Sequence, residues 1–242
     1  MKKILYAFLI ASGVSTFVGC SSDDSAENLQ NDERFVEKMT VKLFSGQPTA
    51  QLVGTFDFNY SGKDVTSIMK VVTSGTGDIL ESQNYTYQYD GNKIVSYQIA
   101  NFTPSTVTYN GDKIKNLGFG SDLEYTSSGL LHKDSYGTEY VYLSDNPIGT
   151  SVNPYLYTYD DKKNPFAWHN MNFRLIFEEQ FELYQSTDFF RSSNNLLSEA
   201  DGSETIQRTI EYNSENLPTK ITTRYAGSNQ ILEEITYEYS LP

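Results

Sequence analysis

Hydrophobic and polar residues alternate in short stretches along most of this chain. The clearest stretch is Tyr85–Tyr89, in which Thr86 and Gln88 separate three tyrosines. The stretches Tyr155–Tyr159 and Ile235–Tyr239 alternate in the same way. Because successive side chains of a strand point to opposite faces, this period of two predicts strands with one aromatic face and one polar face.

A longer phrase recurs around these stretches. It consists of an apolar or aromatic residue, a spacer, a tyrosine, a turn rich in Asp, Asn, Ser, Gly and Lys, and then aliphatic residues. The tyrosines before the turns are Tyr60, Tyr89, Tyr109, Tyr125, Tyr142, Tyr159, Tyr212 and Tyr239. From Tyr109 the next three follow at steps of 16, 17 and 17 residues. This regularity indicates repetition of one supersecondary unit.

Each unit is predicted to be a β-hairpin. Asp90-Gly91 and Asn110-Gly111 are dipeptides that suit tight hairpin turns, because Gly, Asn and Asp accept a positive φ. The aliphatic residues after each turn would begin the returning strand. We therefore predict a mainly-β fold, an antiparallel meander of hairpins with short connections.

The phrases resemble the YD repeats of Rhs-type proteins, and still more those of repeat-bearing lipoproteins of Bacteroidota. The resemblance spans most of residues 56–239. It implies β-hairpins stacked into an extended or curling sheet, and it implies no catalytic residues. The spacing departs from the family period of roughly 20 residues, and residues 165–209 interrupt the pattern.

The interruption has the rhythm of a helix rather than of a strand. Its aromatic and aliphatic residues fall at steps of three and four, and charged residues take much of the other face. The apolar positions are Phe173, Ile176, Phe177, Phe181 and Tyr184, and the charged ones are Arg174, Glu178, Glu179 and Glu182. We expect a helical insertion at about residues 166–186 that covers the open sheet. The alternative is an element that contacts a partner or a membrane through Trp168, and residues 191–204 are predicted to form a polar loop.

The N-terminus has the pattern of a bacterial lipoprotein signal. Met1–Lys3 is basic, Ile4–Val18 is mostly apolar, and Gly19 precedes Cys20, the only cysteine of the chain. Phe17 stands where this signal prefers Leu, so cleavage without lipidation, after Gly19 or Gly13, is the alternative. We interpret residues 1–19 as a signal peptide and Cys20 as the lipidated residue.

Lipidation of Cys20 would determine both where the protein is located and how it is attached to the membrane. Several acyl chains on its sulfur and amine would hold the chain durably in outer-membrane lipid. The next residues, Ser21-Ser22-Asp23-Asp24, resemble the acidic surface-export signal of Bacteroidota lipoproteins. That resemblance implies the cell exterior. Residues 20–33 would form an acidic, flexible tether, and residues 34–242 a single domain.

The composition of the chain restricts both its possible ligands and the way its core is built. Removal of Lys2 and Lys3 with the signal lowers the formal charge from −13 to −15, which argues against nucleic acid as a ligand. One cysteine leaves no disulfide to stabilise an exported domain. The 19 tyrosines and 14 phenylalanines must therefore supply much of the core.

Candidate chemistry is sparse. His132 and His169 both adjoin polar turns, and we interpret both as surface histidines rather than metal ligands. Ser67-Ile68-Met69-Lys70 matches a Ser-x-x-Lys motif without its companion motifs, and Asp57–Gly62 opens like a calcium loop but has Ile68 at the twelfth position. The adjacent carboxylates are Glu178 with Glu182 and Glu233 with Glu234. We expect no metal and no cofactor.

The alternating tyrosines are the remaining candidate binding surface. They could form an exposed platform for a sugar or a peptide, together with Trp168. The other interpretation, which we favour, is that these rings pack the sheet against its helical cover. The residues are Tyr85, Tyr87, Tyr89, Tyr155, Tyr157 and Tyr159.

We therefore expect a lipid-anchored surface protein that binds or scaffolds a protein or glycan partner and is not an enzyme. The alternative is a hydrolase of surface polysaccharide or peptide that uses carboxylates from loops near residues 160–204. Carboxylates that converge in one place would favour the hydrolase, and carboxylates scattered over turns would favour the binding module.

We predict that Cys20→Ala abolishes membrane attachment but leaves the domain folded, because Cys20 supplies the anchor and lies outside the repeats. Labelling cells with a radioactive fatty acid measures lipidation directly. Wild-type protein that takes up no label would contradict the lipoprotein interpretation.

Overall fold

The alternating stretches of the sequence form antiparallel strands, which confirms the predicted meander. The computed structural model describes residues 33–44, 46–151, 156–180, 192–200 and 204–241. Residues Glu33–Pro242 belong to one compact unit. The predicted lipidation and export residues, Cys20 to Asp24, lie outside the described residues.

Eleven strands form the main sheet, in the order β13-β14-β15-β16-β17-β1-β2-β3-β4-β5-β6. Their bounds are β1 (Phe35–Leu43), β2 (Leu52–Ser61), β3 (Asp64–Ser74), β4 (Ile79–Asp90), β5 (Lys93–Ile99), β6 (Ser105–Thr106), β13 (Leu156–Lys163), β14 (Asn194–Ala200), β15 (Thr205–Tyr212), β16 (Pro218–Tyr225) and β17 (Ile231–Ser240). Neighbouring strands in this order are consecutive strands of the chain, except at β17 and β1.

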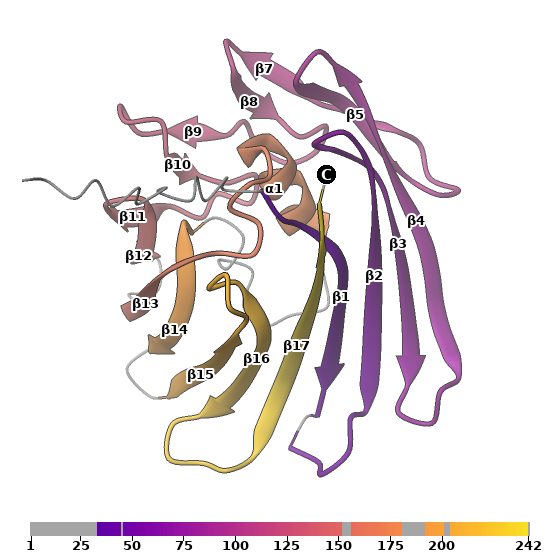
Figure 1. The fold of residues 1–242 in the computed structure, drawn as a ribbon. Helices are drawn as coiled ribbons and strands as arrows, with labels where there is room; N and C mark the ends of the chain where they lie inside the picture. Colours follow the sequence, from indigo (N-terminus) through magenta and orange to yellow (C-terminus); the bar gives the residue numbers. More distant parts are fainter. Residues whose placement is uncertain (1–32, 45, 152–155, 181–191, 201–203, 242) are drawn as a thin grey trace, which may run out of the picture. The chain divides into compact units, whose positions relative to one another are not determined.

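Three further hairpins lie between β6 and β13 in the chain. They are β7 (Thr108–Asn110) with β8 (Lys113–Asn116), β9 (Glu124–Tyr125) with β10 (Leu131–Lys133), and β11 (Tyr140–Leu143) with β12 (Asn146–Thr150). Figure 1 shows the main sheet curving around the helix α1 (Met171–Gln180).

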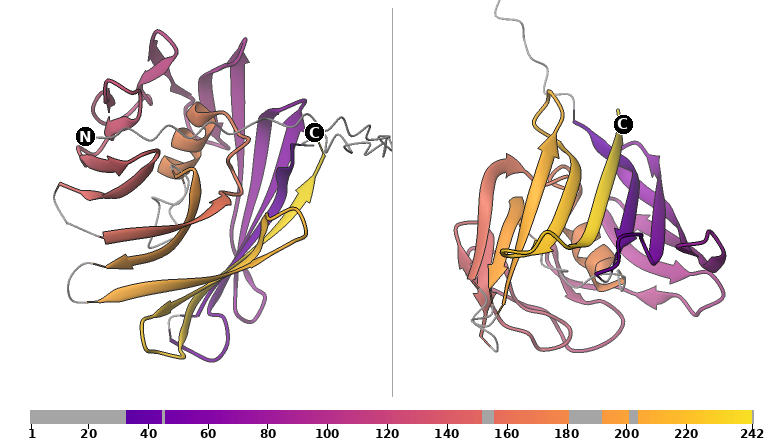
Figure 2. Two further views of the ribbon diagram at one scale, coloured as in Figure 1. Left: turned by 60° about the vertical axis from the view of Figure 1, so that its left-hand side comes forward. Right: turned by 90° about the horizontal axis from the view of Figure 1, so that it is seen from below.

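The first and last strands of the chain pair with each other inside the sheet. β1 and β17 are antiparallel, and their register runs from Phe35 opposite Ser240 to Leu43 opposite Glu233. Figures 1 and 2 show the two strands side by side, well away from the sheet's outer edges. The two ends of the sheet are therefore β13 and β6, which are internal in the sequence.

Four of the hairpins share one turn geometry. Two residues connect the strands, and the first has a positive φ: Gly62, Gly91, Gly111 and Ser144. A positive φ at the first of two turn residues matches the right-handed twist of the strands, and three of the four positions carry Gly, which adopts it without strain. In each hairpin the register shifts directly before the tyrosine that precedes the turn.

The hydroxyl of that tyrosine links one hairpin to the previous one. It donates a hydrogen bond to the carbonyl of the residue that pairs with the tyrosine of the neighbouring hairpin, which for Tyr60 is Tyr239 of β17. We call these bonds the hydroxyl ladder: Tyr60 to Val36 (2.7 Å), Tyr89 to Val65 (2.9 Å), Tyr109 to Ile94 (2.9 Å), Tyr159 to Pro147 (2.7 Å) and Tyr239 to Pro218 (2.7 Å).

Burial keeps these phenols protonated. It raises the pKa of Tyr109 to about 12, although the hydrogen bond to Ile94 acts in the opposite direction. Burial also raises the pKa of Tyr89 well above its ordinary value, with Asp64 adding to the effect. Each hydroxyl therefore remains a donor across the physiological pH range.

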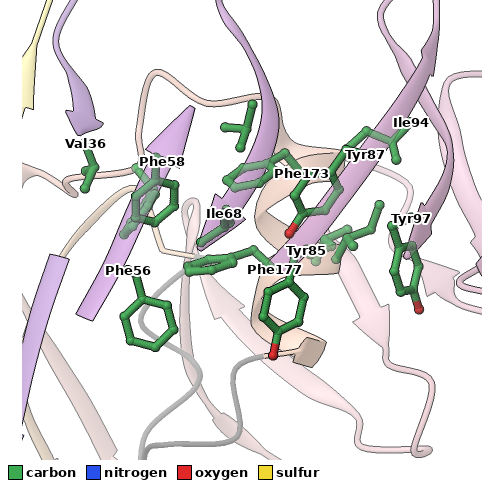
Figure 3. Packing of buried hydrophobic residues seen from close by; sticks show 14 of the residues in the cluster. Val36, Phe56, Phe58, Ile68, Tyr85, Tyr87, Ile94, Tyr97, Phe173 and Phe177 are labelled. Atoms are coloured by element: carbon green, nitrogen blue, oxygen red, sulfur yellow. The ribbon is translucent and has the colours of Figure 1, made fainter. Parts of the chain in front are cut away.

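The residue two positions before each of these tyrosines points into the core. Phe58, Tyr87, Tyr157 and Tyr237 are each at most 8% exposed. Helix α1 and the turn before it pack on them: Phe177 meets Phe58 at 5.5 Å between ring centroids, and Phe173 meets Tyr87 at 5.5 Å. Figure 3 shows Tyr87 with Phe173 and Phe177 in this core. Helix α1 thus buries its aromatic residues against the sheet, as predicted.

The start of the helix is tied to the hairpin turns. Asn170 caps it, because its side-chain oxygen accepts from the main-chain nitrogen of Asn172 at 2.9 Å. The Asn170 amide group donates to the carbonyl of Asn92 in the β4–β5 turn at 2.9 Å. The repeats therefore help to position the segment that interrupts them.

Two sequence predictions about the insertion are wrong. Arg174 and Glu178 do not face solvent, since they are 4% and 3% exposed. Arg174 instead donates to the carbonyl of Ser192. The polar loop predicted at residues 191–204 contains the strand β14, which pairs with β13 and β15. Phe181 and Tyr184 lie outside the described residues.

In the described part of the chain, no helix combines the length and the apolar composition that a membrane crossing requires.

We predict that Tyr89→Phe lowers the free energy of unfolding by about 1 kcal/mol, because the variant loses only the hydroxyl that bonds Val65. Urea denaturation measures the change. Tyr136→Phe is the control, since the Tyr136 side chain is 73% exposed. Equal losses for the two variants would contradict a stabilising role for the hydroxyl ladder.

Candidate functional site

The predicted tyrosine platform is largely interior. Tyr85 and Tyr87 are 6% exposed and Tyr157 is 8% exposed, while Tyr89 and Tyr159 are half-buried at the margin of the core. Tyr155 lies outside the described residues. Tyr85, Tyr87 and Tyr157 therefore do not present an exposed surface, and these positions follow the packing interpretation.

Trp168 lies beside the helix and not among these tyrosines. Its side chain is half-buried, and the ammonium of Lys163 lies 4.8 Å from its ring centroid. A cation over an indole face is a stabilising contact that keeps the cation near water. Trp168 thus packs on the strand that leads into the insertion.

His169 is not a surface histidine, contrary to the sequence prediction. It is 6% exposed, and its ring lies 5.2 Å from Phe35, 5.2 Å from Phe166 and 5.4 Å from Phe173. Tyr60 donates its proton to the carbonyl of Val36, so the Nε2–H of His169 donates to the Tyr60 oxygen at 2.9 Å.

The surroundings keep this imidazole neutral. Burial lowers the pKa of His169 to about 3, and the positive charge of Arg174 contributes in the same direction. A neutral, enclosed imidazole that bonds a tyrosine of the hydroxyl ladder serves packing. The burial of His169 could not be predicted from the sequence, because His169 adjoins a polar turn.

The residues of the weak sequence motifs lie in ordinary strands and turns of the fold. Ser67 and Lys70 lie three residues apart on β3 and therefore point to opposite faces. Ser67 accepts from Asn59 at 3.1 Å on the outer face, whereas Lys70 is 5% exposed and pairs with Glu81 at 2.9 Å. Asp57 to Gly62 run along β2 into its turn. His132 is half-buried on β10.

The two predicted carboxylate pairs are not pairs. Glu233 and Glu234 are adjacent on β17, and the alternation of the strand sends them to opposite faces. Glu234 meets Lys220 at 2.7 Å, and Glu233 lies opposite Thr223 on the other face. Glu178 is buried on α1, and Glu182 lies outside the described residues.

Glu233 instead belongs to a cross-strand group on the concave face, which we call the charged row: Glu199, Arg208, Thr223 and Glu233. Arg208 donates from Nη2 to Glu199 Oε2 at 2.9 Å. Arg208 lies opposite Thr223, and Thr223 lies opposite Glu233 and donates to its Oε1 at 3.4 Å. The charged row thus spans four neighbouring strands, β14 to β17.

The electrostatics of the charged row favour one neutral carboxyl. Burial raises the pKa of Glu233 to about 7, and the negative charge of Glu199 adds to the rise. The guanidinium of Arg208 and the Thr223 hydroxyl act in the opposite direction. Glu233 is therefore partly protonated near neutral pH.

A sequence signal for the charged row did exist. Arg208 stands in phase with Ile206 and Ile210 on β15, and Glu233 stands in phase with Ile235 on β17. A charge at the apolar phase of an alternating strand predicts a buried polar contact. The sequence reading passed over these positions because it looked for adjacent carboxylates.

Of the carboxylates near residues 160–204, Glu199 belongs to the charged row, whereas Asp160 does not. Asp160 accepts from the main-chain nitrogen of Asn195 at 3.0 Å and of Lys162 at 3.0 Å, and the Tyr212 hydroxyl donates to it. These bonds fasten β13 to β14 and β15. Across the described ranges, no group of three or more His, Cys, Asp and Glu residues could hold a metal ion.

The outer face of β2, β3 and β4 has an uncharged area. We call it the neutral surface: Val53, Thr55, Met69, Val71, Thr73, Ile79, Ser82 and Asn84, which neighbour one another in the register. Ile79 is 69% exposed and Met69 is 37% exposed. Leu80, on β4, is 59% exposed, and Phe102, in the loop after β5, is 61% exposed.

The comparisons with known proteins inform the fold. No protein-family model matches the sequence, and no curated protein matches it either. Among solved structures, a porin-like protein from Bacteroides uniformis is similar, with a TM-score of 0.52 and 13% sequence identity. The match covers 85% of this chain and 98% of that chain. At this identity the similarity shows a shared fold alone.

We predict that Glu233→Gln stabilises the protein increasingly as the pH rises from about 4.5 to about 7. The folded state holds the Glu233 proton more tightly than the unfolded state does, so the wild type loses stability over that range. The amide of Gln does not ionise, and the gain reaches up to about 3 kcal/mol above pH 7.

Urea denaturation at a series of pH values measures this gain. Glu234→Gln makes the same change one residue away, on the outer face of the sheet, and is the matched control. The same pH-dependent gain in both variants would rule out Glu233 as the cause.

Proposed function

We propose that this protein is a lipid-anchored outer-membrane protein that faces the cell exterior and binds or scaffolds a protein or glycan partner without catalysis. The observation that carries the proposal is the polarity of the sheet: its concave face is apolar and aromatic, and its outer face is polar.

The polarity is clearest where β15, β16, β17 and β1 lie side by side. Ile221, Val41 and Tyr237 point inward and are at most 5% exposed. The outward positions include Gln207, Glu211, Lys220, Glu234, Lys42 and Glu238. Strands that cross a membrane show the opposite pattern, with apolar side chains toward lipid. This supports a sheet that stands in water, although the structural neighbour is described as porin-like.

A sheet that stands in water needs a separate attachment if the protein belongs to a membrane. Lipidation of Cys20 would provide it, and the segment at residues 20–33 would act as the tether. The acidic residues Asp23 and Asp24 support transfer to the outer surface through their resemblance to an export signal. Attachment by acyl chains leaves every face of the domain available to a partner.

The neutral surface supports partner binding. It places Met69 and Ile79 on an open strand face with no charged residue among its eight members, on a chain of net charge −13. Charged residues are depleted and Met is enriched in the cores of protein interfaces. An exposed, uncharged strand face with apolar side chains such as Ile79 therefore suits contact with a partner.

The placement of the carboxylates supports a role without catalysis. Asp64, Asp90 and Asp112 stand beside or within hairpin turns, where short acidic side chains serve backbone geometry. Asp160 fastens three strands, and Glu199 pairs with Arg208. The hydrolase alternative requires two carboxyl groups that flank a substrate bond, and the approach of Glu199 and Glu233 in the charged row is the observation that favours it.

We predict that Met69→Arg combined with Ile79→Arg lowers partner recovery at least about tenfold, because an unpaired charge in an interface is costly. The measurement is chemical cross-linking in native membranes, followed by purification of the lipidated protein. Leu143→Arg is the control, since Leu143 is 68% exposed on β11, away from the neutral surface. Equal recovery of partners with the double variant and with the control would refute the neutral surface as the contact.

A further inference from the structure

The domain begins at the end of the sheet that carries the hairpin turns of the tyrosine phrase, which we call the turn end. Glu33 pairs with Lys63 of the β2–β3 turn. Arg34 donates two hydrogen bonds to the carboxylate of Glu215 in the β15–β16 turn, at 2.9 and 2.8 Å. These contacts hold the residues before β1 between two hairpin turns. The proposed tether therefore leaves the domain at the turn end.

The proposed tether is short compared with the strands. Cys20 and Glu33 are 13 residues apart in the sequence. A flexible linker of that length spans roughly 20 Å on average. β4, with 12 residues, is about 40 Å long at the rise of an antiparallel strand. A lipid anchor at Cys20 would therefore keep the turn end closer to the bilayer than the opposite end of the sheet.

Three side chains with accessible apolar surface lie at the turn end: Trp168, Met171 and Leu241. The ring of His169, the residue after Trp168, lies 5.2 Å from that of Phe35. Phe35 pairs with the residue directly before Leu241. Met171 is 44% exposed, Leu241 is 57% exposed and Trp168 is half-buried. The apolar side chains are thus beside the point at which the tether leaves.

Hydrogen bonds place Met171 at the level of the hairpin turns. The Asn170 amide donates to the carbonyl of Asn92 at 2.9 Å, and the Asn172 amide donates to the carbonyl of Asp112 at 3.5 Å. Asn92 and Asp112 are the second residues of the β4–β5 and β7–β8 turns. Met171 stands between the two amides in the chain. It therefore belongs to the surface of the turn end and not to a face of the sheet.

Trp168 has the surroundings of a tryptophan at a membrane–water interface. Its ring faces the ammonium of Lys163, which is exposed and lies 4.8 Å from the ring centroid. Tryptophan is enriched at this interface because its ring is apolar and its N–H is polar. A lysine side chain can cover apolar surface while its charge stays in water. The pair beside an exposed Met171 therefore suits the boundary between lipid and water.

Bases accompany several carboxylates of the turn end. Lys93 pairs with Asp112 at 3.1 Å, and Lys162 pairs with Asp161 at 3.5 Å. Two further ion pairs flank the start of β1. Pairing reduces the repulsion that a chain of net charge −13 would otherwise meet at a headgroup surface. The turn end can thus approach lipid although the chain as a whole is acidic.

We propose, on the basis of the lipid anchor in the proposed function, that the turn end docks on the bilayer surface and that Trp168, Met171 and Leu241 enter the interface. The anchor holds this end beside the lipid, so a weak additional contact suffices. The strands then stand away from the membrane, and Leu80 of β4 lies about 33 Å from the turn end at the rise of an extended strand. Docking of this kind leaves the neutral surface open to a partner.

Trp168 is the only tryptophan of the chain, so its fluorescence reports the docking directly. The lipidated protein is added to phosphatidylcholine vesicles with plain or with brominated acyl chains, since bromine quenches an indole that it contacts. We expect a loss of Trp168 fluorescence in the brominated vesicles relative to the plain ones. Protein that floats with the vesicles but shows no such loss would overturn the docking and leave the anchor intact. Protein that does not float would overturn both.

A variant with the indole at the opposite end is the matched control. It combines Trp168→Phe with Leu80→Trp, and position 80 is well exposed, since Leu80 is 59% exposed. We expect equal fluorescence of this variant in brominated and plain vesicles. Quenching as strong as that of the wild type would show that the domain contacts lipid without a preferred end, which contradicts the proposal.

A charge at the contact tests its chemistry. Met171→Glu places a carboxylate in the first turn of α1, where it is compatible with the helix, and circular dichroism checks the fold. We expect weaker quenching of Trp168 with flotation unchanged, whereas Leu80→Glu should leave the quenching unchanged. Leu241→Glu, at the end of the chain, provides the same test if Met171→Glu does not fold. Full quenching in the folded variants of the turn end would refute the docking contact.

Discussion

The hydrogen bond from a tyrosine hydroxyl to the carbonyl of the preceding hairpin is the interaction on which the sheet depends. A two-residue turn fixes each hairpin internally but does not fix how one hairpin lies against the next. The hydroxyl ladder supplies that relation, because each tyrosine reaches the residue that pairs with the previous tyrosine, as Tyr89 reaches Val65 and Tyr109 reaches Ile94. A register shift directly before each tyrosine accompanies this arrangement.

The same regularity explains where polar groups are buried. Inward positions near the tyrosine end of the strands carry rings that pack on α1, such as Phe58 and Tyr87. Farther along the strands the inward positions carry ion pairs, Lys70 with Glu81 and Arg208 with Glu199. Desolvation offsets much of the attraction within such ion pairs, so they contribute little to stability compared with the apolar packing on α1.

Much of the fold could be predicted from the sequence, because its determinants are local. Alternation identifies the strands, and Asp90-Gly91 or Asn110-Gly111 identifies the turns. The interior of the helical insertion could not be predicted, since Arg174 and His169 are polar residues whose burial depends on the sheet around them. The alternation marks Arg208 and Glu233 as inward-facing charges, but which charges meet depends on the pairing of four strands, which adjacent residues do not reveal.

The pairing of β1 with β17 has a consequence for the order in which the molecule is made. β17 lies between β16 and β1, so it joins the β13–β17 half of the sheet to the β1–β6 half. Phe35 pairs with Ser240, so β1 cannot complete this pairing until almost the entire chain has been synthesised. The two halves of the sheet can therefore join only after β17 has been synthesised, whatever local hairpins have already formed.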